Sequence, residues 1–120
     1  MATYSKVLLS GSTQGMGVKV AATATAGTSI HATGTSASII DEVWLYAYNS
    51  DTSDRVLTIE YGDATAPDHN IVLTLAAAKG LVLIVPGLVL TGSGSVAATV
   101  KAFCDSANKV TLSGYVNRIT

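Results

Sequence analysis

The chain has few charged side chains. Only 12% of its 120 residues are Asp, Glu, Lys or Arg, whereas a typical soluble domain has roughly 25%. Seven basic and eight acidic residues leave a formal net charge of −1 at pH 7. A protein that binds nucleic acid presents a basic patch to the phosphates. The charge balance therefore argues against nucleic acid as a partner.

Cysteine and long hydrophobic runs are also scarce. Cys104 is the only cysteine, so an internal disulfide framework and a cysteine zinc site are excluded. We expect it to be a small buried hydrophobe. The longest apolar run, residues 81–90, contains Pro86-Gly87 and is shorter than the roughly 20 residues that span a bilayer. Residues 1–10 lack the pattern of a signal peptide, so we expect synthesis in the cytoplasm and no membrane association.

Short segments rich in Val, Ile, Thr and Tyr alternate with turn residues along the whole chain, a pattern typical of all-β proteins. The length fits one domain over residues 1–120. Residues 96–103 fit a helical stripe as well as a strand, and we interpret them as a strand. No segment predicts a helix long enough to cover a sheet, so the sheets must cover each other. The predicted fold is all-β, a single antiparallel β-sandwich that is jelly-roll-like, with strands at residues 3–10, 18–25, 43–48, 55–61, 69–75, 81–85, 96–103 and 110–119.

Two segments have a distinctive local pattern. Residues 43–48 place aliphatic side chains on one side and Trp44, Tyr46 and Tyr48 on the other, the period of a strand. Together with residues 55–61 they form the best predicted hairpin. Residues 21–38 are almost entirely Ala, Thr, Ser and Gly, and their composition fits an extended segment and a mobile surface loop equally well.

Signatures of phosphate binding and hydrolysis are incomplete. Residues 92–97 match G-x-G-x-x-A, but the acidic residue expected roughly 20 positions later is missing. The glycine-rich residues 11–17 lack the Lys-Ser/Thr of a phosphate loop. A catalytic base would have to be His31 or His69, and no G-x-S-x-G motif accompanies either. The possible glycosidase carboxylates, Asp41, Glu42 and Glu60, are too few to indicate a site. We therefore predict that the protein is not an enzyme.

The densest group of possible metal ligands is Asp63, Asp68 and His69. Carboxylate oxygens with one imidazole suit a hard or borderline ion. However, Asp63 follows a glycine and Asp68 follows a proline, positions at which aspartate usually accepts local backbone hydrogen bonds in turns. We favour turns at both positions and predict no metal and no cofactor.

The shortage of charge has a consequence for the surface. A monomer of 12.2 kDa exposes roughly 6,000 Å², which this chain has few charges to cover. Residues 81–85 are apolar on both sides and predict a strand buried on both faces. With no helix to cover it, another chain is the expected cover. Trp44, Tyr46 and Tyr48 are the candidate interface or core aromatic face, which we expect to be largely buried.

Six segments carry a resemblance that runs nearly end to end: residues 8–12, 20–28, 30–31, 57–62, 83–87 and 114–119. In them the chain resembles small structural proteins encoded among the head genes of tailed bacteriophages. The resemblance implies a capsid decoration, or cement, protein: a β-sandwich, often trimeric, that sits on the outside of the virion shell and bridges neighbouring major capsid protein subunits. It implies no site residues.

Two alternatives remain. The first is another virion accessory module, such as a tail or head-fibre component. The second is a small carbohydrate-binding β-sandwich module, for which Trp44, Tyr46 and Tyr48 would form an exposed platform. We expect a homo-oligomer, most simply a trimer, because so few charges cannot easily cover a solvated monomer, and we expect it to be made in the host cytoplasm.

Overall fold

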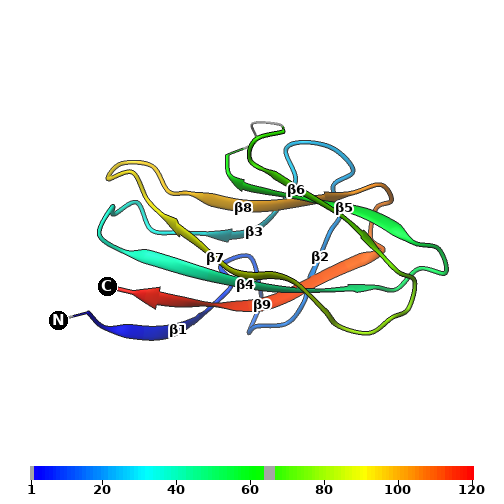
Figure 1. Cartoon of the computed structure of the whole chain (residues 1–120), viewed down its shortest axis with the longest axis horizontal. Helices are drawn as coiled ribbons and strands as arrows, with labels where there is room; N and C mark the ends of the chain where they lie inside the picture. The colour runs from blue at the N-terminus through cyan, green and yellow to red at the C-terminus, as the bar shows by residue number, and fades with distance from the viewer. Residues whose placement is uncertain (1, 64–66) are drawn as a thin grey trace.

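The computed structural model describes residues 2–63 and 67–120, and in this part of the chain it contains strands and no helix. The molecule is elongated, with extents of 48 × 26 × 21 Å, and β1 and β9 run antiparallel to each other at one side of it (Figure 1). The strands are β1 (Tyr4–Leu8), β2 (Val18–Lys19), β3 (Thr28–Ala32), β4 (Ile40–Asn49), β5 (Arg55–Gly62), β6 (Asn70–Leu75), β7 (Val82–Thr91), β8 (Thr99–Cys104) and β9 (Val110–Ile119).

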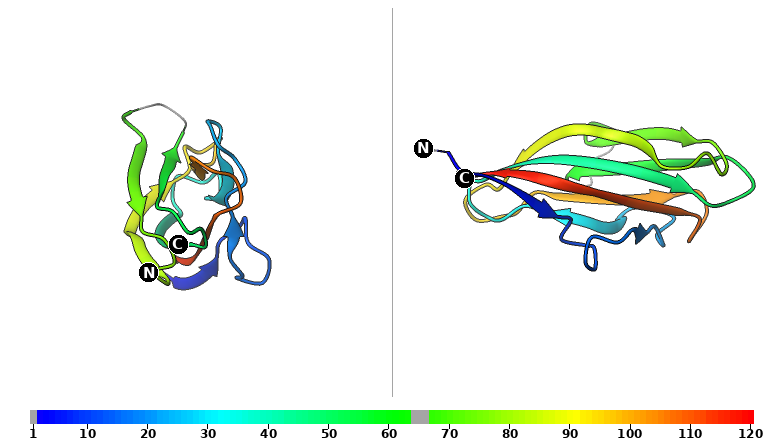
Figure 2. Two further views of the ribbon diagram at one scale, coloured as in Figure 1. Left: turned by 90° about the vertical axis from the view of Figure 1, so that its right-hand side faces the viewer. Right: turned by 90° about the horizontal axis from the view of Figure 1, so that it is seen from below.

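The strands form two antiparallel sheets. The five-stranded sheet has the order β1-β9-β4-β7, with β2 also pairing with β9, and the four-stranded sheet has the order β3-β8-β5-β6. Strands from the two halves of the chain therefore alternate in each sheet, and successive strands from β2 to β9 change sheet except between β5 and β6. This interleaving is a jelly roll. The predicted all-β sandwich is confirmed (Figure 2).

The core lies between the sheets and follows from alternation along the strands. In β4, Val43, Leu45 and Ala47 are fully buried, because every second side chain points to the same face. The four-stranded sheet contributes Leu57 and Ile59 from β5. Cys104 is also fully buried, as predicted, and burial raises the pKa of its thiol.

The predicted hairpin between residues 43–48 and 55–61 is wrong. β4 pairs with β7 and β9, whereas β5 pairs with β6 and β8 in the opposite sheet. Both segments are strands, as expected, but the connection between them crosses from one sheet to the other. Alternation specifies the two faces of a strand and does not specify its neighbour.

In the single chain residues 81–85 are covered on one side only, and the expectation that another chain covers the other side stays a prediction. β7 is an edge strand, and Leu83 is 44% exposed while Val85 is buried. Pro86-Gly87 does not end the strand. The pairing register with β4 shifts twice along β7, between the partners of Val43 and Trp44 and between those of Leu45 and Tyr46. Such bulges let an irregular strand continue along a sheet.

The low-complexity segment 21–38 is partly extended. β3 lies within it and pairs with β8. β8 covers most of residues 96–103, so the strand predicted there is confirmed. The small residues allow close backbone approach: a Cβ on Gly27 would lie 2.5 Å from the carbonyl oxygen of Ala102. The strand predicted at residues 18–25 is much shorter, because only Val18 and Lys19 pair with β9.

Candidate functional site

The aromatic side chains of β4 lie on the side of the five-stranded sheet that faces away from the core, which we call the outer face. Trp44 and Tyr46 are half-buried, and Tyr48 is 38% exposed. Of the two placements expected for these residues, the sandwich core and an interface, the structure excludes the core. The aliphatic residues at the odd positions of β4 fill it instead. Burial against a neighbouring subunit remains a prediction.

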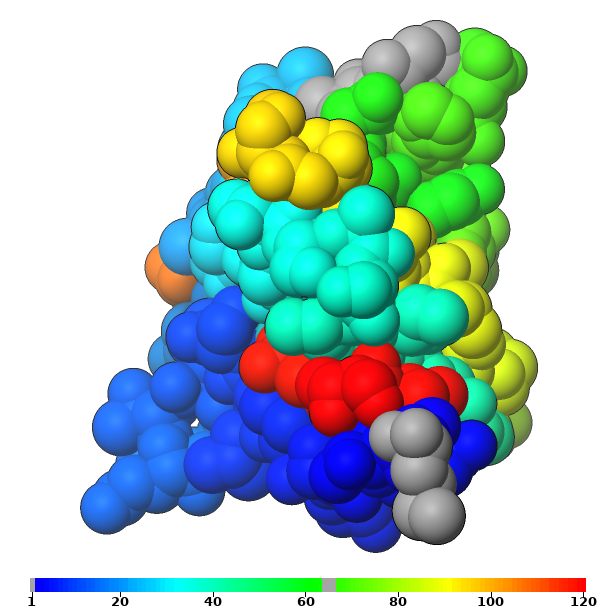
Figure 3. All heavy atoms as spheres, turned by 90° about the vertical axis from the view of Figure 1, so that its left-hand side faces the viewer, coloured from blue at the N-terminus to red at the C-terminus, as the bar shows by residue number. Residues whose placement is uncertain are grey.

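Large apolar side chains from four strands gather on the outer face. Pairing places Tyr115 of β9 beside Trp44 and Leu8 of β1 beside Tyr115, so that they form one row across the sheet. Two rows further along the sheet, Ile119 lies between Tyr4 and Ile40. The exposed large hydrophobic residues of this face are Tyr4, Leu8, Ile40, Tyr48, Leu83 and Val89. Figure 3 shows the end of the molecule at which the last residues of β9 lie between β1 and the segment that leads into β4.

Trp44 is held in place by three neighbours. Its ring stacks on Tyr115, with centroids 6.3 Å apart and planes 8° from parallel. Its Nε1–H donates to Glu42 Oε1 over 2.6 Å. The indole also lies over Gly87 of β7, where an added Cβ would be 3.4 Å from the ring. The Trp44 and Tyr115 rings are thus held in place before any partner arrives, which reduces the entropy lost on binding.

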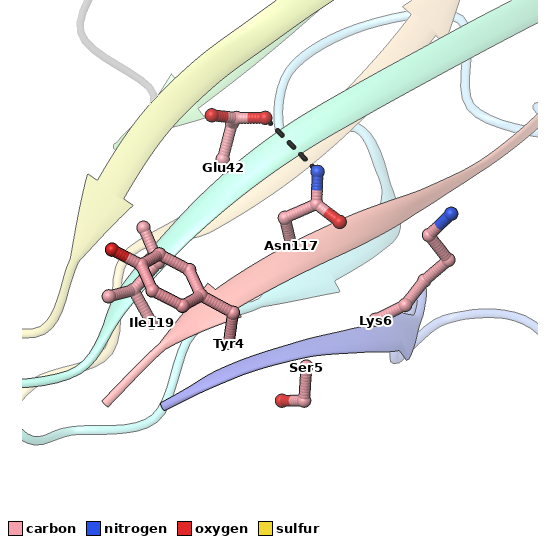
Figure 4. Close-up of a pocket in the computed structure, with 6 residues that line it drawn as sticks. All are labelled: Tyr4, Ser5, Lys6, Glu42, Asn117 and Ile119. Carbon is pink, nitrogen blue, oxygen red and sulfur yellow. Dashed lines mark hydrogen bonds between the residues drawn. The ribbon is translucent and has the colours of Figure 1, made fainter. Parts of the chain in front are cut away.

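A shallow hollow of about 270 Å³ lies beside the row of Leu8, Tyr115 and Trp44. It is lined by Tyr4, Ser5, Lys6, Glu42, Asn117 and Ile119 (Figure 4). Asn117 Nδ2 donates to Glu42 Oε1 over 3.1 Å. The hydrogen bonds from Trp44 and Asn117 hold the pKa of Glu42 below its usual value. The Lys6 ammonium lies 4.6 Å from the centre of the Tyr115 ring. The hollow therefore combines one cation and one anion with apolar surface, a composition that suits binding.

A second polar cluster lies between the two sheets and consists of His31, Asp41 and Arg118. His31 Nε2 lies 2.8 Å from Asp41 Oδ2. Arg118 donates to both carboxylate oxygens of Asp41 from Nε and Nη2, over 2.8 and 2.9 Å. The Ser10 backbone N–H donates to His31 Nδ1 over 3.0 Å. Because Nδ1 accepts this hydrogen bond, the ring proton is on Nε2 and is donated to Asp41.

The chemistry of this cluster is structural. Both nitrogens of His31 are engaged, and the side chains of His31 and Asp41 are 1% and 0% exposed. Burial alone would raise the pKa of Asp41, but the hydrogen bonds and charge of Arg118 together with the hydrogen bond from His31 lower it. Asp41 is therefore an anion paired with Arg118. Sequence reasoning missed this pair, because Arg118 is 77 residues away from Asp41.

The other carboxylates singled out in the sequence do not meet in a cleft. Glu42 lies on the outer face, whereas Asp41 points into the core side of the same strand. Glu60 is buried in β5 of the other sheet. There it accepts hydrogen bonds from the Thr25 hydroxyl and the Gly27 backbone N–H, over 2.5 and 2.7 Å. Glu60 thereby anchors the low-complexity segment.

The candidate metal ligands lie at an exposed loop next to β5 and β6. His69 Nδ1 and Asp63 Oδ1 are 2.5 Å apart, and this contact raises the pKa of His69. At Asp68 it is the backbone carbonyl that accepts a hydrogen bond, from the Tyr61 hydroxyl. Among residues 2–63 and 67–120, no group of three or more His, Cys, Asp or Glu side chains is arranged to hold a metal ion.

The glycine motifs form close backbone contacts. In residues 92–97, the Ser93 N–H donates to the Val96 carbonyl over 2.8 Å, closing a turn. At Gly11, an added Cβ would lie 2.5 Å from the Ser29 carbonyl oxygen.

No protein-family model, no curated protein and no solved structure matches the chain. Within the described residues there is also no helix long and apolar enough to cross a membrane.

Proposed function

We propose that this protein is a non-enzymatic capsid decoration protein that binds the outside of an assembled phage shell and stabilises it by bridging major capsid protein subunits. The sequence resemblance to phage head proteins supplies the role. The observation that carries the proposal is the outer face, which is apolar and aromatic. The chain as a whole also has few charged residues. Its place would be the exterior of the virion.

The composition of the outer face supports an interaction with protein. Interface cores are enriched in aromatic residues and depleted in charge. Trp44, Tyr46, Tyr48 and Tyr115 occupy the middle of the face. The chain alone exposes 6161 Å², close to the roughly 6,000 Å² expected for a monomer of this mass. The exposure of Tyr4, Leu8 and Val89 shows that much of the outer face is open surface of the single chain.

The mechanism is stabilisation by mass action. A protein that binds only the assembled shell stabilises that state by an amount that grows with the logarithm of its concentration relative to its dissociation constant. Self-association, which the resemblance implies as a trimer, would let one particle touch several capsid subunits. Weak contacts would then combine into a strong attachment.

The direct test mixes the purified chain with shells of the phage that encodes it, prepared without the chain. We expect co-sedimentation with expanded shells, a saturating stoichiometry set by the shell lattice, and a higher temperature of shell disruption. Unexpanded shells serve as the control. An absence of binding to expanded shells at micromolar concentrations would contradict the proposal, and binding to tails alone would favour the accessory-module alternative.

The partly exposed side chains of Trp44, Tyr46 and Tyr48 favour one second candidate, a carbohydrate-binding module. Aromatic rings at alternate positions of a strand lie about 7 Å apart, and such rings can stack on successive sugar rings. Trp44→Ala and Tyr48→Ala would then abolish retention on immobilised polysaccharides, while Val72→Ala on the other sheet would not. If the unmodified chain is not retained on any polysaccharide tested, this candidate fails.

A further inference from the structure

The edges of the five-stranded sheet are unsuited to pairing with another chain. Edge strands that avoid such pairing carry lysine, proline or bulges. At one edge, β1 carries Lys6 in the middle of its five residues. At the other edge, β7 contains Pro86-Gly87 and two shifts of register. A partner of this sheet would therefore contact the outer face.

The register of the strands shows which charges this face presents. Asn117 of β9 pairs with Lys6 of β1 on one side and with Glu42 of β4 on the other. The cation and the anion thus lie in one row, at equal distances from β9. Rotation by 180° about an axis parallel to β9 exchanges the two positions.

We propose that the outer face packs against the same face of a second copy of this chain, about a two-fold axis that runs parallel to β9. Lys6 of each copy then lies opposite Glu42 of the partner subunit. In the flanking rows, Leu8 lies opposite Trp44 of the partner subunit, and Tyr4 lies opposite Ile40 of the partner subunit. In these two flanking rows each apolar residue meets an apolar residue, and the row between them pairs its two charges.

The geometry of the face suits this contact. Strands lie about 4.8 Å apart and rise about 3.3 Å per residue, so β4 and β9, of ten residues each, and β1, of five, offer about 400 Å² in projection. Relief of the side chains makes the accessible area larger. A standard interface buries about 800 Å² on each partner. An axis parallel to the strands also gives the aligned arrangement in which β-sheets pack face to face. The direction of the strands therefore fits a second copy, whereas the projected area alone is about half that of a standard interface.

The contact goes beyond the proposed function, because it requires no shell. It joins two chains, whereas the resemblance to phage head proteins implies three. The mass of the purified assembly therefore tests the two-fold contact separately from binding to the shell.

The test is a charge exchange read out by sedimentation equilibrium. We expect the unmodified chain to form dimers. Lys6→Glu places two carboxylates opposite each other. It should weaken dimerisation at least about tenfold, because each pair of opposite charges becomes a pair of like charges. The double variant Lys6→Glu with Glu42→Lys restores unlike pairs and should recover dimerisation. Lys79→Glu, the same change in a loop outside the face, is the matched control and should leave the dissociation constant unchanged.

A second pair of variants covers the case in which Glu42→Lys fails to fold, since Glu42 accepts hydrogen bonds from Trp44 and Asn117. Tyr4 is 73% exposed and Val72, on the other sheet, is 63% exposed, so a glutamate at either position leaves the single chain folded. Tyr4→Glu should abolish the dimer and Val72→Glu should not. A monomeric or trimeric unmodified chain would overturn the proposal, as would a dimer that Lys6→Glu and Tyr4→Glu leave intact.

Discussion

At the scale of single residues, the His31, Asp41 and Arg118 cluster connects the two sheets. His31 belongs to β3 of the four-stranded sheet, whereas Asp41 and Arg118 belong to neighbouring strands of the five-stranded sheet. A buried anion is tolerated only when it is paired and its oxygens accept hydrogen bonds. The Asp41 carboxylate meets both conditions, and this makes it the most sensitive polar position of the described core.

Asp41→Asn is expected to lower the free energy of unfolding by about 3 to 5 kcal/mol, because it removes the anion and leaves Arg118 and His31 with an unsuitable partner. Urea unfolding at neutral pH measures the change. Asp68→Asn, at an exposed turn, is the matched control and should be nearly neutral. Equal stability of the two variants would show that the cluster contributes nothing.

The same carboxylate predicts how stability depends on pH. Its pKa in the folded chain is lower than the ordinary value of 3.8, so its contribution is complete above pH 3.8 and is lost as the pH falls through the folded-state pKa. The difference in stability between the unmodified chain and Asp41→Asn should therefore shrink in this acid range. A difference that stays constant down to pH 2 would contradict the assignment.

Trp44→Ala tests the placement of the Trp44 side chain on the outer face. Since the indole is half-buried on the outer face, losing its contact with Tyr115 and its hydrogen bond to Glu42 should cost about 1 to 2 kcal/mol in a single folded chain. Removing a core tryptophan would cost about 3 to 5 kcal/mol. Thermal unfolding at concentrations too low for self-association distinguishes the two, and the larger value would contradict an outward-facing Trp44.

At the scale of the elements, the sequence predicts strands better than it predicts their neighbours. The segments around β4, β5, β6 and β9 are recognisable from alternation alone. The two sides of β4 are both apolar, however, so the pattern did not reveal that Val43 and Leu45 face the core while Trp44 faces outward. The apolar residues 81–85 likewise carried no sign of which side faces the core, or that β7 lies at an edge of the sheet.

The same limit applies to the candidate site. Trp44, Tyr46 and Tyr48 are recognisable in residues 43–48, because they are close in sequence. Tyr115, Asn117 and Lys6 were missed, since only the strand order β1-β9-β4 brings them beside these side chains. Long-range pairing depends on which strands cross between the sheets, and local composition carries little information about that choice.

Gly114 tests the central strand pair. It lies opposite Leu45 in β4, its φ is +149°, and an added Cβ would lie 2.0 Å from the Trp44 carbonyl oxygen. Gly114→Ala must therefore push β9 away from β4, and we expect a loss of about 2 to 3 kcal/mol in the free energy of unfolding. Gly34→Ala is the control, since no atom lies within 4 Å of its added Cβ. Similar unfolding midpoints for both variants would contradict the close approach.

At the scale of the whole molecule, the jelly roll buries the aliphatic side of β4 and leaves the aromatic side outside. The edges of the five-stranded sheet carry features that oppose strand addition, while its outer face is uncharged except at a few positions, among them Lys6 and Glu42. Such a molecule is suited to association through a face. The same surface cannot contact the shell and a second copy at once, so decoration of a shell and pairing of two copies are alternative uses of this face.

The most direct measurement is an electron cryomicroscopy reconstruction of the intact phage particle that carries this chain. The account predicts density for the β-sandwich on the outside of the shell, in contact with more than one major capsid protein subunit, with the outer face covered by protein. A particle whose shell lacks the chain, or a bound chain whose Trp44, Tyr46 and Tyr48 face open solvent, would contradict it.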